Sequence, residues 1–220
     1  MNYVFNFRDI WAQQEFLLDG IRVTLLLSAV TIVCGLVIGA VGAATQVYGG
    51  PVLRMISAGY VEVIRNTPLI VQLFIVFFGL PSAGIRLDAM TASLIALAIN
   101  LGAYTAEIMR AGLEAIPRSQ VEAGHSLGLS GLQVFRHVVM FPALKVIYPA
   151  LTSQFVLIML ATSVVSQIST PDLFHVASII QSRTFRDFEI YLVVAILYLL
   201  LALALRLLFA AAGQIAFGRR

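Results

Sequence analysis

Two pairs of oppositely charged residues stand within or beside the apolar stretches of this chain. Glu62 precedes Arg65 by three positions, and Glu107 precedes Arg110 by the same spacing. Residues three apart lie on one face of a helix, so each pair can form an ion pair. Ionisable groups at membrane depth are costly and usually functional, but near a helix end a long side chain extends easily to the interface. We therefore predict gate-forming or structural ion pairs here, rather than contacts to a substrate.

Uncharged polar residues form a second set of candidates, because several of them stand in otherwise apolar segments. They are Gln72, Asn100, Gln154, Thr162, Ser163 and Gln167. Each could simply form a hydrogen bond between neighbouring helices. Together they are the best candidates for lining a polar path through an apolar protein, and we predict that role for them.

The most informative polar segment lies between the third and fourth apolar stretches. Pro117 ends the preceding helix, because it has no N–H to donate. Ser119 and Glu122 have the spacing of a capping box, in which each side chain accepts a hydrogen bond from an amide at a helix start. Gly128 can adopt the left-handed conformation that ends a helix. The pattern predicts a short helix over about 118–128, which on this basis alone could be an ordinary capped connector.

The composition restricts the class of protein. Of the 220 residues, 60% are apolar and 11% are charged, whereas soluble domains average about 25% charged residues. The mean hydropathy is +0.95. These values exclude a soluble enzyme, a disordered chain and a nucleic-acid binder. A single Cys rules out a Cys-based metal site, and no His has a partner at metal-ligand spacing. We predict no metal site and no catalytic residue.

The apolar stretches predict an all-α integral membrane protein with five spanning helices. The expected spans are about 22–47, 60–80, 88–110, 145–168 and 189–211. Each is long enough for a helix to cross a bilayer, and too long and continuously apolar for a barrel strand. Residues 1–20 predict an amphipathic helix in the outer interface, anchored by Trp11. The membrane domain then covers 21–212, and 213–220 form a tail.

The basic residues predict the orientation of these spans. With the N-terminus outside, the outer segments hold Arg8, Arg22, Arg86, Arg183 and Arg186. The inner segments and inner helix ends hold Arg54, Arg65, Arg110, Arg118, Arg136, Lys145, Arg206, Arg219 and Arg220. Because basic residues favour the cytoplasmic side, we predict that the N-terminus is outside and the C-terminus is cytoplasmic.

Three strings of residues, in order, resemble one family. Glu122-Ala123-Gly124, followed by Gly128, resembles the Glu-Ala-Ala loop of binding-protein-dependent ABC importer permeases. The segment 62–81, with its Asn-Thr-Pro turn, is similar to the signature of the polar amino acid permeases, and 100–112 agrees with it. The resemblance implies the type I ABC importer permease fold with a cytoplasmic coupling helix that docks on an ATPase subunit. The implied coupling residues are Ser119, Glu122, Ala123, Gly124 and Gly128.

The resemblance also implies partners and a location. These are a second permease copy or paralogue, two ABC ATPase subunits, an external solute-binding protein, membrane lipid and the bacterial inner membrane. The chain has no GxxxxGK[ST] motif, so ATP must be bound by the partner subunits and no cofactor is expected here. Several family members carry a Lys-Asp pair where this chain has Leu160-Ala161. We therefore favour a heterodimer, in which a paralogue supplies most substrate contacts.

Two other classes of function fit an apolar helical chain. One is a self-powered secondary transporter or channel, against which stand the odd number of spans and the lack of a visible inverted repeat. The other is a membrane-embedded enzyme, for which the sequence offers no Ser/His pair at membrane depth, no metal motif and no acidic cluster. The predicted function is import of polar amino acids by a permease driven by separate ATPase subunits.

Overall fold

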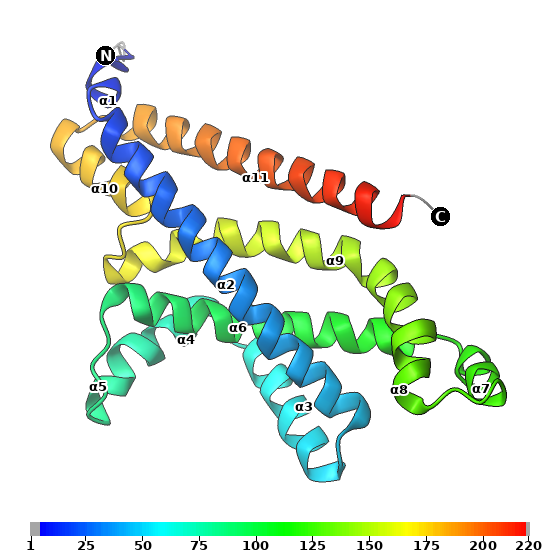
Figure 1. Cartoon of the computed structure of the whole chain (residues 1–220). Helices are drawn as coiled ribbons and strands as arrows, with labels where there is room; N and C mark the ends of the chain where they lie inside the picture. The colour runs from blue at the N-terminus through cyan, green and yellow to red at the C-terminus, as the bar shows by residue number, and fades with distance from the viewer. Residues whose placement is uncertain (1–4, 219–220) are drawn as a thin grey trace.

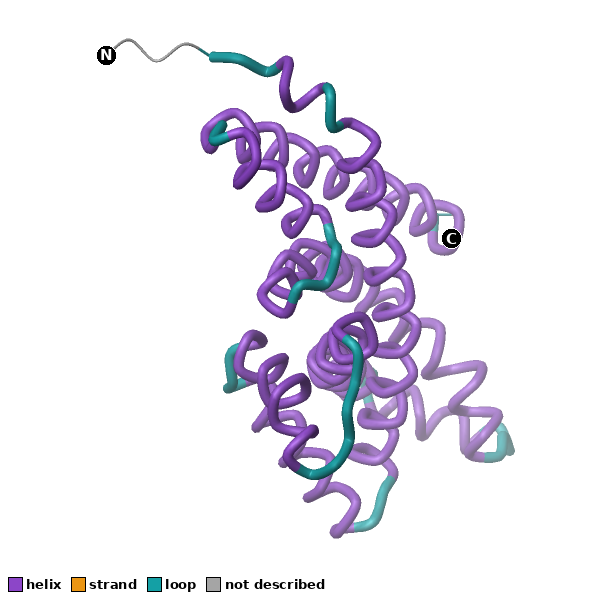
Figure 2. The backbone as a smooth tube through the Cα atoms, turned by 90° about the vertical axis from the view of Figure 1, so that its left-hand side faces the viewer, coloured by secondary structure: helices purple, strands orange, loops and turns teal. Residues whose placement is uncertain are grey.

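The computed structural model describes residues 5–218, and every regular element in this range is helical (Figures 1 and 2). The helices are α1 (Arg8–Trp11), α2 (Gln14–Tyr48), α3 (Pro51–Arg65), α4 (Leu69–Phe74), η1 (Ile75–Gly79), α5 (Leu80–Ser82), α6 (Ala89–Glu114), α7 (Arg118–Ser126), α8 (Gly131–Val134), η2 (Phe135–Val139), α9 (Met140–Ala161), η3 (Thr162–Ile168), α10 (Leu173–Thr184) and α11 (Asp187–Phe217). Short connections join them, which agrees with the all-α class that the sequence predicts.

Within the described residues, four helices are long and apolar enough to cross a membrane, and there are five candidates if the bent pair of α3 and α4–α5 counts as one span. α6, α9 and α11 lie side by side, and α2 crosses them diagonally (Figure 1). α6 is the central helix. In its most apolar stretch of 18 residues 61% are buried, whereas in the corresponding stretch of α11 only 6% are buried. The core is therefore built around α6, and α11 stands at the edge.

Small residues let α2 approach α6 closely. A Cβ atom on Gly39 would lie 2.0 Å from Thr105 Oγ1, and one on Gly35 would lie 2.7 Å from Leu101 Cγ. The Thr105 hydroxyl in turn lies 2.8 Å from the Gly35 carbonyl oxygen. Close packing through small residues is a common way to join helices in lipid, where burial of apolar surface gives little driving force. Any larger residue at Gly39 would separate the two helices.

The second span differs from the expected continuous helix over 60–80. α3 ends at Arg65, α4 begins at Leu69, and the two segments meet at an angle of 107°. Pro68 lies at the N-cap of α4 in extended conformation. Because proline lacks an N–H and disfavours helical backbone in the residue before it, the helix cannot run through this point. The prediction of an unbroken helix here was wrong.

The N-terminal segment also differs from the prediction for 1–20. α1 is a single turn, and α2 starts at Gln14 and continues directly into the first span. Ile10 and Leu17 are buried in a cluster that includes Leu173 and Ile190, whereas Trp11 is 67% exposed. Residues 5–20 therefore do not form one separate helix. Residues 1–4 of that segment, and Arg219 and Arg220 of the tail, lie outside the described residues.

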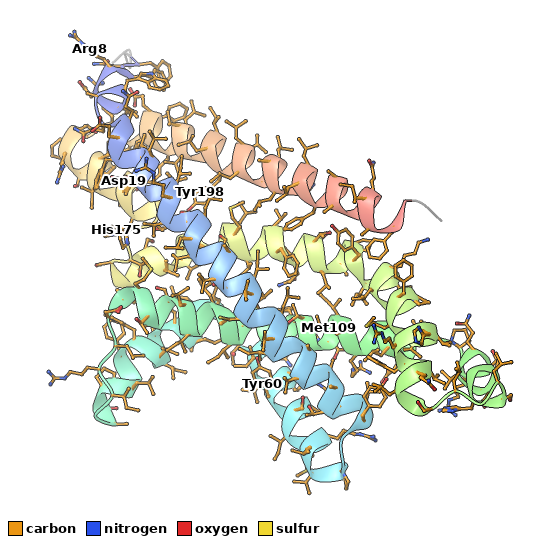
Figure 3. The ribbon with its side chains drawn as sticks, in the orientation of Figure 1. Arg8, Asp19, Tyr60, Met109, His175 and Tyr198 are labelled. Carbon is orange, nitrogen blue, oxygen red and sulfur yellow. The ribbon has the colours of Figure 1, made fainter. Side chains whose placement is uncertain are left out.

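α10 lies in the segment between the fourth and fifth predicted spans. Its first turn packs on α2, where a Cβ atom on Gly20 would lie 2.9 Å from Leu173 Cα. Asp172 is the N-cap and accepts hydrogen bonds from the amides of His175 (2.9 Å) and Phe174 (3.2 Å). The Tyr198 hydroxyl of α11 donates to the same carboxylate at 3.1 Å. Tyr198 and His175 are both labelled in Figure 3. The Asp172 carboxylate is fully buried, and burial raises its pKa.

Candidate translocation site

The break between α3 and α4 is held by one buried side chain, Gln72. Its amide nitrogen lies 2.8 Å from the Ile64 carbonyl oxygen and 3.0 Å and 2.9 Å from the carbonyl and hydroxyl oxygens of Thr67. Its amide oxygen accepts a hydrogen bond from Asn100 of α6 at 3.0 Å. Gln72 therefore satisfies backbone groups that the bend leaves without helical partners, and it fixes the bend to the central helix.

A polar cavity of about 610 Å³ opens beside this break. It is lined by Arg65, Asn66, Thr67, Pro68, Leu69, Asn100, Tyr104, Gln154, Leu157, Ile158 and Ala161. Its walls come from three places: the bend, α6 and α9. Irregular backbone at membrane depth is tolerated where it is buried in protein or lines a water-filled cavity. Discontinuous helices of this kind form the binding sites of many transporters.

The structure brings only some of the predicted path residues together. Asn100 and Gln154 line the cavity, and Gln72 lies behind Asn100. Thr162 and Ser163 donate to carbonyl oxygens of their own helical turn, at 2.7 Å and 2.8 Å, and do not line it.

Gln167 is exposed and also lies outside the cavity. Tyr104, Asn66 and Thr67 also line the cavity and were not among the predicted path residues. The Asn-Thr-Pro turn was the available signal for the last two, since a proline inside an apolar stretch marks a helix break.

The charged residues form a network that differs from the predicted pairs. Glu107 pairs with Arg110 at 2.6 Å, as the spacing indicates, and Arg110 also binds Glu114 at 2.6 Å. Arg65 lies 3.9 Å from Glu107 instead of pairing with Glu62. Glu62 accepts a hydrogen bond from the Asn66 side chain at 2.8 Å. The predicted Glu62–Arg65 ion pair is wrong. Glu62 instead accepts from Asn66, which follows α3 at the helix break.

Arg65 connects this network with the cavity. Its guanidinium carbon lies 5.6 Å from the centre of the Tyr104 ring, in cation–π geometry. Its side chain is partly exposed, and it lines both the polar cavity and the charged recess beside α3. The salt bridge to Glu107 is at the limit of ion-pair distance, so the guanidinium retains donors that can turn toward the cavity.

α7 ends in the backbone arrangement expected of Gly128. The glycine has φ of +77°, its N–H donates to the His125 carbonyl at 2.9 Å, and the Leu129 N–H donates to the Gly124 carbonyl at 3.2 Å. These two bonds define a Schellman motif, which requires a left-handed residue at this position. The prediction that Gly128 ends the short helix is confirmed.

The predicted capping box at the start of α7 is not formed. Pro117 is the N-cap and Arg118 is the first helical residue, so Ser119 and Glu122 lie two positions too far into the helix to cap it. A capping box is present instead at the next helix start, where the Ser130 N–H donates to the Gln133 side chain at 2.8 Å. Proline at the helix boundary fixes the local backbone, so the helix starts two residues before the position that a Ser119 cap would require.

The surface of α7 is open except along one line of contact. Ser119, Glu122 and Ala123 are exposed, and Gly124 is buried. A Cβ atom on Gly124 would lie 3.0 Å from Val134 Cγ2, so the glycine lets α7 lie directly on α8. No group of three or more metal-ligating side chains occurs among residues 5–218. α7 leaves most of its side chains uncovered by the rest of the subunit.

The bent helix, the polar cavity and the exposed short helix together define a helical membrane transport subunit. The sequence profile of the binding-protein-dependent transport system inner membrane components matches residues 31–214. The chain belongs to this family. It is therefore a multi-pass inner-membrane permease component of an ABC importer, with no catalytic site of its own and no cofactor expected. Its family implies ATPase and binding-protein partners, which excludes a self-powered transporter.

Individual relatives cover nearly the whole chain. The probable glutamine ABC transporter permease protein GlnM of Bacillus subtilis is 35% identical over 86% of this chain and 87% of its own length. The glutamine transport system permease protein GlnP of Escherichia coli K12 is 34% identical, over 91% and 93%. A crystal structure of an amino acid ABC transporter with histidines has a TM-score of 0.90 and 34% identity, covering 96% of this chain and 99% of that one.

Proposed function

We propose that this permease imports polar amino acids and that the cavity beside the α3–α4 break is part of their path. The observation that carries the proposal is the meeting, in one cavity, of a broken helix, the guanidinium of Arg65 and the amides of Asn100 and Gln154. A guanidinium matches the carboxylate of an amino acid, and side-chain amides match a polar side chain. Relatives described as glutamine permeases support this class of cargo.

Gln154 provides a test of the cavity with a matched control. Gln154→Leu removes an amide from the cavity wall, whereas Gln167→Leu makes the same change at an exposed position outside it. In proteoliposomes with the partner subunits, Gln154→Leu should reduce ATP-driven glutamine uptake by roughly tenfold, which is the effect of losing about 1.4 kcal/mol. Gln167→Leu should remain near wild type. Equal uptake by both variants would exclude the cavity from the path.

We propose that α7 couples transport to ATP hydrolysis by docking on the ATPase subunit through Ser119, Glu122 and Ala123, with Gly124 and Gly128 shaping it. The first three are exposed, and the Schellman turn exposes backbone at the end of α7. The charged network of Glu107 and Arg110 lies at the α7 end of α6, where it joins the coupling segment to the helix that lines the cavity. We assign it a structural or gating role.

The orientation that we propose has the N-terminus outside and α7 in the cytoplasm. Ser130 and Ser182 are both exposed, and they lie next to α7 and in α10 respectively. In a Cys34→Ser background, an impermeant thiol reagent applied to intact spheroplasts should label Ser182→Cys and spare Ser130→Cys. Labelling of the Ser130→Cys variant from outside would reverse the proposed topology.

We further propose that the functional unit is a heterodimer. Ala161 lines the cavity, at one of the two positions where several family members carry a Lys-Asp pair, so this wall lacks a charge. A paralogous permease would then supply most of the substrate contacts, in addition to those proposed for Arg65, Asn100 and Gln154 of this chain. The chain should be purified with its ATPase, without a second permease, and reconstituted with the binding protein. Strong amino acid-stimulated ATPase activity from that complex would contradict the heterodimer.

A further inference from the structure

A second crevice, separate from the polar cavity, lies between α9 and α11. It has a volume of about 690 Å³, and none of its lining residues lines the polar cavity. The two helices lie side by side (Figure 1). Because α11 is the least buried of the long helices, this crevice lies at the edge of the subunit, away from the centre of the fold.

The floor of the crevice is built by Tyr148 of α9. Its hydroxyl donates to the Phe209 carbonyl oxygen of α11 at 2.6 Å, and its ring lies 5.2 Å from that of Phe217. A Cβ atom on Gly213 would lie 2.6 Å from the Tyr148 ring, so the glycine makes room for it. These contacts hold the helices together along one line and leave an aromatic, largely apolar groove beside it.

Two cations line this apolar groove. Lys145 and Arg206 are both exposed, and both line the crevice. Among residues 5–218, no carboxylate lies within ion-pair distance of either one. Unpaired cations inside apolar spans are costly, so each favours an anionic partner or the headgroup region. The crevice therefore combines a positive pole with an apolar groove.

The depth of the two cations matches that of lipid headgroups. Arg206 is 19 positions beyond Asp187, the first residue of α11, a rise of roughly 28 Å at 1.5 Å per residue. Lys145 stands 16 positions before Ala161, the end of α9, about 24 Å away by the same measure, and the seven residues of η3 add about 14 Å at roughly 2 Å per residue. The hydrocarbon core is about 30 Å thick. Both cations thus lie near the same interface when the opposite helix ends lie at the other one.

We propose that the α9–α11 crevice binds an anionic phospholipid. The phosphate lies between Lys145 and Arg206, and an acyl chain lies along the aromatic groove past Tyr148. Basic pockets between membrane helices bind anionic headgroups in this way. This inference goes beyond the proposed transport function, since it needs the spans but neither the cargo nor the orientation.

The test measures quenching of tryptophan fluorescence, and the chain has a single native tryptophan to replace. Trp11 lies at the N-terminal end, far along the sequence from the crevice. Trp11→Phe with Phe217→Trp places one reporter tryptophan in the crevice, and the full chain is reconstituted in phosphatidylcholine with about one quarter phosphatidylglycerol. Quenching by brominated phosphatidylglycerol is then compared with quenching by brominated phosphatidylcholine.

The expected result is a preference of about tenfold for brominated phosphatidylglycerol, since each basic residue near a membrane surface adds substantially to anionic lipid binding. Lys145→Gln with Arg206→Gln should bring the two lipids to near equality. Arg136→Gln, which removes an exposed cation outside the crevice, should leave the preference unchanged. Inorganic phosphate should not displace the lipid.

Three results would overturn the proposal. Equal quenching by both lipids in the protein that retains both cations would show no anionic preference. Quenching by neither lipid would show that protein, such as a second copy of the chain, covers the crevice. Displacement by inorganic phosphate would assign it to a soluble anion. The first comparison needs neither Gln substitution, so it decides the matter even if the double variant fails to insert.

Discussion

α7 and α10 are both short helices that connect spans, and they differ in how they are held. α10 is packed into the fold: Leu173, Val176, Ala177 and Ile180 are buried, and its N-cap Asp172 bonds to α11. α7 has one buried residue, Gly124, and the rest of its surface is not buried by the subunit. Its ends are fixed by its own backbone, through Pro117 and the Schellman turn at Gly128. One helix gains its position from tertiary contacts and the other from local geometry.

This difference predicts that α10 contributes mainly to the stability of the fold and α7 mainly to binding a partner. A helix held by the core contributes to the fold, and its exposed residues are few. A helix held by its own termini can present nearly all of its side chains to a partner without weakening the body of the protein. Substitutions in α10 should therefore lower stability first, whereas substitutions in α7 should lower partner binding at nearly constant stability.

The largest effect is expected at the buried cap of α10. Asp172→Ala leaves the amides of His175 and Phe174 and the hydroxyl of Tyr198 without their acceptor. Loss of a helix cap together with unpaired buried donors costs about 2–4 kcal/mol. The thermal unfolding midpoint of the purified protein should fall clearly.

Asp88→Ala provides the matched control. Asp88 caps α6 in the same way, accepting from the Thr91 amide and hydroxyl, but it is exposed, and those hydrogen bonds lower its pKa. Its loss should cost less, since water can replace the lost acceptor. Equal midpoints for the two variants would remove the distinction between a core-held and a solvent-held cap.

Gly128→Asp should produce the second-largest effect, on function rather than folding. A non-glycine residue at φ of +77° adds about 1 kcal/mol of strain or more, and the added carboxylate lies at the negative end of the α7 dipole. Membrane insertion should remain normal. ATPase co-purification and transport should fall about tenfold, as expected for a loss of about 1.4 kcal/mol in docking. Wild-type transport with normal ATPase binding would reduce α7 to a connector.

A smaller effect should distinguish the observed capping box from the expected one. Ser130→Ala removes the cap of α8 and should lower stability by about 1 kcal/mol. Ser119→Ala changes an exposed residue that caps nothing and should stay within about 0.5 kcal/mol. Chemical denaturation of both variants measures the difference. The reverse order would restore the Ser119–Glu122 box.

The smallest effect is expected from Glu122→Ala. Because Glu122 is exposed and does not cap α7, stability should change by less than about 0.5 kcal/mol. ATPase affinity should fall severalfold if its carboxylate contacts the partner, which a pull-down titration measures. An unchanged affinity would remove Glu122 from the docking surface while leaving Gly128 in it.

Features that depend on local sequence were predictable. Gly128 could be assigned to the helix end because only a residue tolerant of positive φ closes a Schellman turn. The spacing of Gly35 and Gly39 also places them on one side of a helix, which is the side that packs on α6. The apolar stretches were identified because a bilayer requires about 20 apolar residues for each crossing.

Features that depend on distant residues were not predictable. Gln72 looked like one of six polar residues in spans, and only its contacts with Ile64, Thr67 and Asn100 show that it holds a helix break. Arg65 pairs with Glu107 rather than with its sequence neighbour Glu62. In each case the sequence offers several possible hydrogen-bond or ion-pair partners, and spacing along the chain cannot show which of them forms the contact.

The sequence by itself determined that this protein is helical and membrane-spanning, where most of its spans lie, where α7 ends and to which family it is similar. These follow from hydropathy and backbone conformation, which each segment carries alone. The tertiary structure decided how the second span bends, which amides line the cavity and that α10 belongs to the core. Those outcomes depend on which donors, acceptors and small residues meet across helices, and that choice exists only once the helices have packed.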